Sequence, residues 1–175
     1  MGKATKKQLW ALFCITKKDY RDSDISFEEA SRLIEEANRN KKDYVSILEM
    51  AEKAGMEAHE AKIPVPMIVQ QHSNVLDDNS PVLKEYHVSE GFCGFAWIVI
   101  PYKGEGIKFI NALKKKGLAG DSHKCKLSKD SYYGGYSYWV STMTQSLERK
   151  EAFAREFSRV LQENGINCYT NSRMD

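Results

Sequence analysis

The sequence predicts an α+β protein in which an N-terminal helical segment precedes a ferredoxin-like β-α-β-β-α-β sheet with two helices on one face. Apolar residues recur at helical spacing in the first third of the chain, and the second half holds two short runs rich in aromatic and β-branched residues. Two prolines in Ile63–Pro66 mark the change of pattern. We therefore expect a three-helix segment at 1–61, a linker with short strands at 62–90, and a ferredoxin-like α+β domain at 91–175.

The N-terminal segment carries the start signals of helices. Thr5 and Gln8 fit a capping box, and Ser26 and Glu29 fit a second one. The first helix should span about ten residues and the second should run to about Asn38. A third helical stretch follows from residue 44, and we expect Gly55 to act as a left-handed terminator.

The rest of the chain reads as alternating strands and helices. Residues 67–69 and 82–88 should be short extended segments, and 92–100 should be a buried strand. We then expect a helix over 107–113 that closes at Gly117, a weaker extended piece at 123–127 and a strand at 136–140. A long helix capped by Ser146 should stop near Gly165, before a last strand at 166–169.

The first of the two aromatic-rich strands has two distinct faces. The first and third strands of the expected sheet lie at its centre, and successive side chains of a strand point to opposite faces. The small and branched set fits beneath two helices, namely Ala96, Ile98 and Ile100. Phe95 and Trp97 should then lie on the open face.

The second aromatic-rich strand is expected to add rings to that face. We expect Tyr136 and Tyr138 to lie beside Phe95 and Trp97, with Trp139 pointing towards the helices. RNA-recognition modules use aromatic residues on the same two strands as stacking platforms. In the alternative interpretation, residues 1–61 fold over the open face and these rings are ordinary core.

Charge is distributed unevenly along a chain whose formal net charge is only +2. Residues 103–129 hold eight lysines against two acids, a local balance of +6, whereas residues 25–60 have a balance of −4. The lysines are Lys103, Lys108, Lys114, Lys115, Lys116, Lys124, Lys126 and Lys129. Such a band is typical of a surface that contacts phosphates or an acidic protein. A solvated face, with Lys114–Lys116 complementing a helix dipole, is the alternative.

Several function classes receive no support from the sequence. There is no apolar run of the length of a membrane span and no apolar stretch typical of a signal peptide, so we expect a cytoplasmic protein. The four cysteines form no C-x-x-C pair, and His123 and Cys125 would supply only two metal ligands. No G-x-S-x-G occurs, and Cys93 and Cys125 lack an identifiable catalytic partner. We expect no cofactor and no metal, identify no catalytic residue, and leave enzyme activity open but disfavoured.

Two parts of the chain resemble modules found in proteins of phages and mobile elements from gut bacteria. The first is Thr5–Phe13 with Ser26–Ser31, and the second is Gly91–Trp97 with Asp130–Gly135 and Asn171–Asp175. Small accessory proteins of this kind include the type II-A anti-CRISPR proteins, which block Cas9. The resemblance implies a non-enzymatic inhibitor of a host nucleic-acid-handling defence complex such as Cas9, acting in the cytoplasm of a bacterial host cell. The alternative is a DNA- or RNA-binding module that uses the lysines and the sheet aromatics. The sequence leaves the oligomeric state open.

Overall fold

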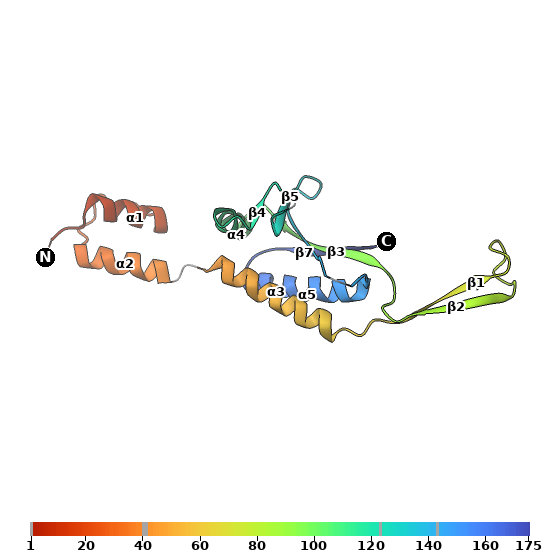
Figure 1. The fold of residues 1–175 in the computed structure, drawn as a ribbon. Helices are drawn as coiled ribbons and strands as arrows, with labels where there is room; N and C mark the ends of the chain where they lie inside the picture. The colour runs from red at the N-terminus through yellow and green to blue at the C-terminus, as the bar shows by residue number, and fades with distance from the viewer. Residues whose placement is uncertain (1, 40–41, 123, 143) are drawn as a thin grey trace. The chain divides into compact units, whose positions relative to one another are not determined.

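The computed structural model describes residues 2–39, 42–122, 124–142 and 144–175 (Figure 1). Within that part of the chain it is a mixed α+β fold with five helices and two sheets. The chain divides into two compact units, Met1–Asp43 and Tyr44–Asp175. The boundary between compact units therefore lies some twenty residues before the expected one at residue 61.

The first unit contains two helices, α1 (Lys6–Thr16) and α2 (Phe27–Arg39). The predicted capping box of α1 is present: the Thr5 hydroxyl accepts from the Gln8 backbone N–H, and Gln8 Oε1 accepts from the Thr5 N–H. Ser26 caps α2, because its hydroxyl accepts from a backbone N–H three residues later at 3.1 Å. Both starts were readable from the sequence because these caps are local.

The core of the first unit is small. Leu12 of α1 and Ala30 of α2 are its buried apolar residues in the described part of the chain. Four other large apolar side chains of the unit are exposed, namely Trp10, Phe13, Ile15 and Phe27. Two short helices with so few buried residues hold little hydrophobic stabilisation of their own.

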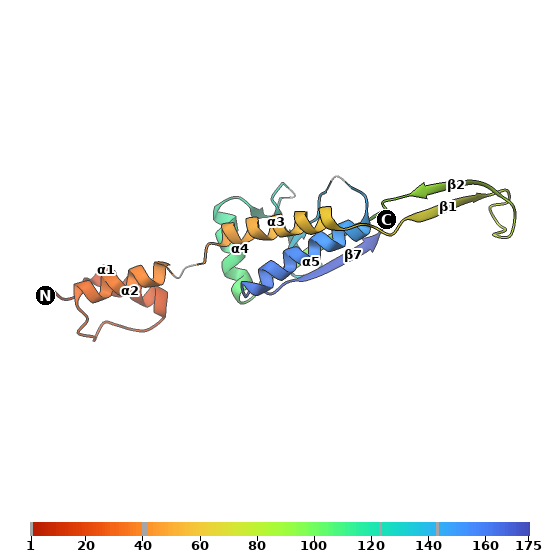
Figure 2. The same cartoon turned by 90° about the horizontal axis from the view of Figure 1, so that it is seen from below.

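The third helix, α3 (Tyr44–Ala61), lies alongside α5 (Leu147–Glu163) in the second unit (Figure 2). The expectation that Gly55 ends this helix is wrong, because Gly55 is buried inside it. A Cβ atom at Gly55 would lie only 2.9 Å from ring atoms of Phe153 on α5. The glycine is required for the close approach of two helices and not for a turn.

The two extended segments predicted in the linker form a hairpin of their own. Strands β1 (Met67–His72) and β2 (Val82–Val88) pair antiparallel, and most of their side chains are exposed. The base of the hairpin is held at the start of α5. There the backbone N–H of Val65 donates to Glu148 at 3.2 Å, and Arg149 pairs with Glu90 at 2.9 Å.

The larger sheet has the strand order β4-β5-β6-β3-β7, and all neighbours are antiparallel except β4 and β5. The aromatic-rich strands β3 and β6 are therefore neighbours inside the sheet, as predicted. The elements along the chain are β3 (Gly94–Pro101), α4 (Glu105–Lys115), β4 (Ala119–Gly120), β5 (Leu127–Asp130), β6 (Gly135–Trp139), α5 and β7 (Tyr169–Met174).

Two strands and one helix cap differ from the expected ones. The strand β4 has only two residues and leaves no pattern in the sequence, and β7 begins where the expected last strand ended. Ser146 precedes α5 as predicted, but its hydroxyl makes no capping hydrogen bond. Gly117 and Gly165 follow α4 and α5 with φ values of 70° and 75°, so both helices end as expected.

One face of the larger sheet is covered by α3, α4 and α5. Ala96, Ile98 and Ile100 of β3 are fully buried there, which confirms the prediction for this strand. The core beneath the helices includes Ile47, Leu48, Phe109, Ile110, Leu113, Phe153, Phe157 and Leu161. Three helices contribute to this face instead of the expected two, because α3 packs here. The interpretation that all of residues 1–61 cover the opposite face is therefore wrong for α3.

Candidate functional site

The register between β3 and β6 decides which aromatic rings share a face. Trp97 pairs with Trp139, and Ile98 pairs with Tyr138. Because residues directly opposite each other in an antiparallel pair point to the same side, Trp139 lies on the face away from the helices. Tyr138 then lies on the helix-covered face with Ile98.

The placement of Tyr136 and Tyr138 on the open face is therefore wrong. Tyr136 is buried opposite Ile100, and Tyr138 packs against Phe153 and Phe157 of α5, with ring centroids 6.0 and 4.5 Å apart. The Tyr138 hydroxyl donates to Glu52 of α3 at 3.1 Å. Burial is the main reason that the pKa of Tyr138 lies far above its ordinary value. This hydroxyl is a structural link between sheet and helix.

The face away from the helices carries a row of six aromatic rings, which we call the aromatic row. Trp139 lies between Phe95 and Trp97, with centroid distances of 5.6 and 5.3 Å, and the two indoles are parallel to within 7°. The other three members are tyrosines. The Tyr133 ring centroid lies 6.3 Å from that of Trp97, 6.4 Å from that of Tyr169 and 4.8 Å from that of Tyr132. Such separations are those of interacting aromatic pairs.

The aromatic row remains accessible to solvent although its rings touch one another. Trp139 is 46% exposed, Tyr169 is 42% exposed and Tyr132 is 87% exposed. Phe95 and Trp97 are half-buried, as residues within a packed row should be. Contiguous exposed apolar surface of this kind is typical of a binding surface.

The tyrosines of the turn between β5 and β6 are positioned by Asp130. Its carboxylate accepts from the backbone N–H groups of Tyr132 and Tyr133 at 3.0 and 3.1 Å and from the Ser137 hydroxyl at 2.6 Å. Burial by itself would raise the pKa of Asp130, but these three hydrogen bonds outweigh burial and hold the pKa below its ordinary value. Gly134, with φ of 70°, allows the chain to turn back into β6.

Two cations and one amide border the aromatic row, Arg173 and Asn171 from β7 and Lys150 from α5. The Arg173 guanidinium and the Lys150 ammonium each lie 5.3 Å from the Phe95 ring centroid. Lys150 is buried and donates to the carbonyl of Gly94 at 2.8 Å, whereas Arg173 is exposed. Asn171 pairs with Trp97 across β3 and β7, and its side-chain Nδ2 is buried without a hydrogen-bond partner.

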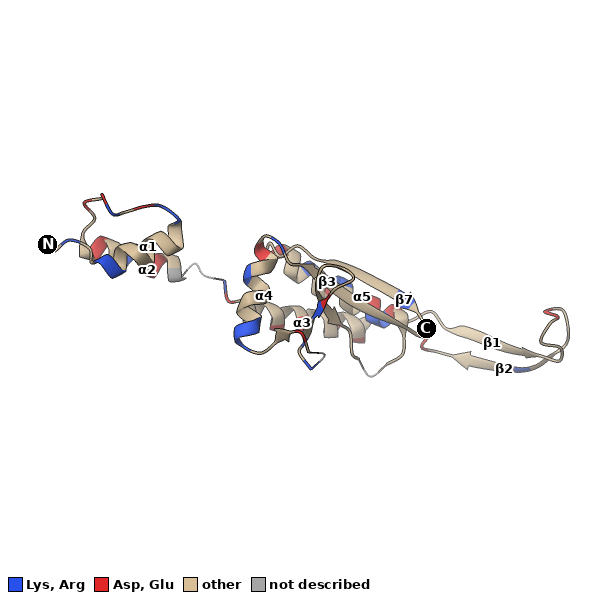
Figure 3. Cartoon of the chain, turned by 90° about the horizontal axis from the view of Figure 1, so that it is seen from above, with Lys and Arg blue, Asp and Glu red and all other residues tan. Residues whose placement is uncertain are grey.

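The eight predicted lysines lie elsewhere. They follow α4 and the segment up to β5: Lys103 before α4, Lys108, Lys114 and Lys115 on it, Lys116 after it, Lys124 and Lys126 before β5, and Lys129 on β5. All eight are exposed. We call this set the lysine band. Figure 3 colours lysine and arginine blue along α4 and the segment that follows it.

The contacts of the lysine band place it on the helix side of the sheet. Lys126 pairs with Glu52 of α3 at 2.6 Å, Lys108 pairs with Glu105 of α4 at 2.9 Å, and Lys114 lies 5.0 Å from the centroid of Tyr136. Lys129 is opposite Tyr136 in the pairing of β5 with β6. The lysine band and the aromatic row therefore do not form the single contact surface that the sequence suggested.

In the described parts of the chain, no group of three or more His, Cys, Asp or Glu side chains could hold a metal ion. Cys93 is exposed and Cys125 is half-buried, and His123 lies outside the described residues. None of the helices in the described ranges is both long and apolar enough to cross a membrane.

Comparison with protein-family models, with curated proteins and with solved structures finds no match for this chain.

Sequence reasoning missed four members or neighbours of the aromatic row: Trp139, Tyr133, Tyr169 and Arg173. The prediction that Trp139 points towards the helices is wrong, because strand β6 has aromatic residues at consecutive positions and alternation alone does not define its buried side. A signal for Tyr133 was available in Asp130–Gly135, where an Asp followed by paired glycines is typical of an Asx-stabilised turn.

Proposed function

We propose that this protein is a non-enzymatic binding protein that holds single-stranded nucleic acid on its aromatic row. The observation that carries the proposal is the trio Phe95, Trp97 and Trp139. These rings lie on two neighbouring interior strands, and the Trp139 ring lies within 5.6 Å of both others, on a sheet face that no helix of the second unit covers in the described residues.

The proposed sheet topology supports this function. We infer that β7-β3-β6-β5 corresponds to the ferredoxin-like β-α-β-β-α-β arrangement, with β4 added at one edge. In RNA-recognition modules, aromatic residues on the two central strands stack bases. Each base stacked on an aromatic side chain contributes about 1–3 kcal/mol, and such stacking is tolerant of sequence.

The charges near the aromatic row predict how binding responds to salt. Arg173 is the exposed cation beside Phe95, because the Lys150 ammonium is buried on the Gly94 carbonyl. Each neutralised phosphate of a single strand adds about 0.7 to the slope of log affinity against log salt. One such contact gives an expected slope of about −0.7, far shallower than the whole lysine band would produce.

The test is fluorescence anisotropy of a labelled single-stranded oligothymidine with wild type, Trp139→Ala and Tyr86→Ala. Tyr86 is a matched control, since it is 44% exposed on the hairpin, against 46% for Trp139. Loss of one stacking partner should weaken binding by about tenfold or more. Tyr86→Ala should bind like wild type. Absence of binding by wild type at low salt, or equal losses in both variants, would contradict the proposal.

A second candidate function is inhibition of a host nuclease complex such as Cas9, in the cytoplasm of a bacterial host cell. The lysine band favours it, because cations spread over α4 and the following segment can engage an acidic or phosphate-bearing surface apart from the aromatic row. Purified protein should then associate with Cas9 and reduce DNA cleavage, and Lys115→Ala with Lys116→Ala should weaken both effects. No association and no reduction would remove this candidate.

A further inference from the structure

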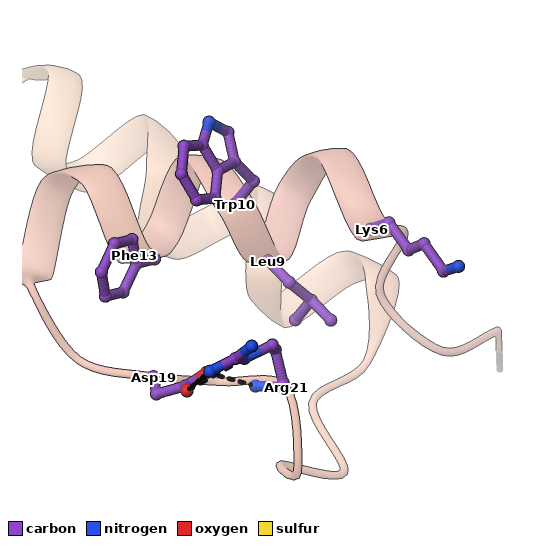
Figure 4. Close-up of a pocket in the computed structure, with 6 residues that line it drawn as sticks. All are labelled: Lys6, Leu9, Trp10, Phe13, Asp19 and Arg21. Carbon is purple, nitrogen blue, oxygen red and sulfur yellow. Dashed lines mark hydrogen bonds and ion pairs between the residues drawn. The ribbon is translucent and has the colours of Figure 1, made fainter.

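The first unit has a groove that neither proposed function uses. A cavity of about 570 Å³ runs between one side of α1 and the loop that follows it, and it is lined by Lys6, Leu9, Trp10, Phe13, Asp19 and Arg21. Leu9 and Phe13 point towards the loop that carries Asp19 and Arg21 (Figure 4). Positions 6, 9, 10 and 13 share one face of a helix, so α1 supplies a continuous wall.

The wall of the groove is apolar and is left exposed by the unit itself. Trp10 is 67% exposed and Phe13 is 39% exposed, and their ring centroids are 5.6 Å apart. The residue that α1 buries against α2 is Leu12, on another side of the helix. Exposed Trp and Phe at three-residue spacing match the anchors of a surface that receives an amphipathic helix.

The start of α1 gives one end of the groove a positive charge, because Lys6 lines it and Lys7 is the next residue. Asp19, the acid that lines it, accepts from Arg21 at 2.6 Å, and these side-chain hydrogen bonds lower the pKa of Asp19 to about 2. Its charge is therefore matched within the protein. Lys6 and Lys7 stand in the first turn of α1, which contains no acidic residue, and the helix dipole adds positive potential there. The segment after α1 is neutral overall, because Lys17, Lys18 and Arg21 are balanced by Asp19, Asp22 and Asp24.

We propose that this groove binds an acidic amphipathic helix of a partner protein, whose apolar face packs on Leu9, Trp10 and Phe13 while its carboxylates meet Lys6 and Lys7 at the start of α1.

A second copy of this chain fits the groove poorly. Another α1 would bring Lys6 and Lys7 against the same lysines, since α1 has no acid among its residues. The acidic helix α2 is also unsuitable, because Leu33 and Ile34 on its apolar side are already half-buried in the pair that it forms with α1. Charge therefore favours a different, acidic partner over self-association.

The probe for the test is a designed helical peptide of about 18 residues, or five turns, with leucines on one face and glutamates beside them. A control peptide has lysines in place of the glutamates. Anisotropy with the full-length protein should show saturable binding of the acidic peptide, weakened by salt, and much weaker binding of the basic one. Equal binding of both peptides, or binding of neither, would overturn the proposal.

Variants of the full chain test the anchor residues. Trp10→Ala should weaken acidic-peptide binding by about tenfold or more, while Ile15→Ala, 42% exposed on the same helix but outside the groove, should leave it unchanged. Lys6→Glu provides a second test that keeps the apolar wall, and it should lower the preference for the acidic peptide. Equal effects of Trp10→Ala and Ile15→Ala would count against the groove.

Two further outcomes of Trp10→Ala would assign the groove to another occupant and overturn the proposal. A loss of self-association in sedimentation would identify a second copy. A loss of oligothymidine binding would identify nucleic acid. Because the proposed function is tested with Trp139→Ala, failure of one proposal leaves the other intact.

Discussion

The helix-covered face and the opposite face of the larger sheet both carry large apolar and aromatic residues, but these residues differ in how far they are buried. On the covered face, Ile98 and Tyr136 are buried against three helices; on the other, Trp97 and Trp139 are covered mainly by other rings. The two faces alternate residue by residue along the same strands. Exposure of an aromatic ring in this protein therefore depends on which layer lies over it and not on the residue type.

A substitution in the covered face should give the largest loss of stability. Ile98→Ala removes a fully buried side chain and leaves a cavity, which should lower the free energy of unfolding by about 2–5 kcal/mol. Trp139→Ala, on the other face, should cost less because nearly half of that side chain is already exposed. Urea unfolding followed by circular dichroism measures both. Equal losses would show that the aromatic row is a second core.

A smaller loss should come from the contact between α3 and α5. Gly55→Ala would place a methyl group 2.9 Å from the Phe153 ring, so the helices must shift, at a cost of about 1–3 kcal/mol. In an exposed helix the same change would stabilise by about 1 kcal/mol. Lys53→Ala on the exposed side of α3 is the control and should stay within about 0.5 kcal/mol. A stabilising effect of Gly55→Ala in urea unfolding would contradict this close contact.

The aromatic face should be sensitive to acid through Asp130. Because its pKa is lower in the folded than in the unfolded state, Asp130 contributes stability above its unfolded pKa of about 4. That contribution is lost as the pH falls below this value and through the folded pKa. Ser137→Ala removes one hydrogen bond to the carboxylate, so its stability should fall less steeply between pH 7 and pH 3. Parallel curves for variant and wild type would show that the Ser137 hydrogen bond does not lower the pKa of Asp130.

The smallest effects are expected at the lysine band. Lys115→Ala with Lys116→Ala should change stability by no more than about 0.5 kcal/mol per site, because both side chains are exposed and end a helix in solvent. If single strands bind on the aromatic row, oligothymidine affinity should stay within about twofold. A large loss of affinity would show that nucleic acid contacts the lysine band on the helix side, and it would contradict binding on the aromatic row alone.

Local signals made most elements predictable. The capping residues Thr5 and Gln8 and the terminal glycines Gly117 and Gly165 act within one helical turn, so the sequence shows them directly. The buried side of β3 was also predictable, since small and branched residues alternate there with aromatic ones.

Features that depend on distant residues were not predictable. The side of β6 that faces the helices follows from the pairing of Trp97 with Trp139, and aromatic residues occupy both sides of that strand. Glycine is a residue type that often follows the end of a helix, but Gly55 lies inside α3 and allows the close approach of Phe153, almost a hundred residues later. The aromatic row likewise needs Asp130 to position Tyr133. Each of these depends on a neighbour supplied by the fold.

The chain enters and leaves the β1–β2 hairpin at almost the same point. A Cβ atom at Gly91, whose φ is 68°, would lie 2.5 Å from the Val65 carbonyl oxygen. The intervening residues therefore form an insertion whose two ends lie close together, and they contribute no strand to the larger sheet. A single recombination event in the gene could therefore add, remove or exchange this hairpin while the order of the other helices and strands of the second unit stayed the same.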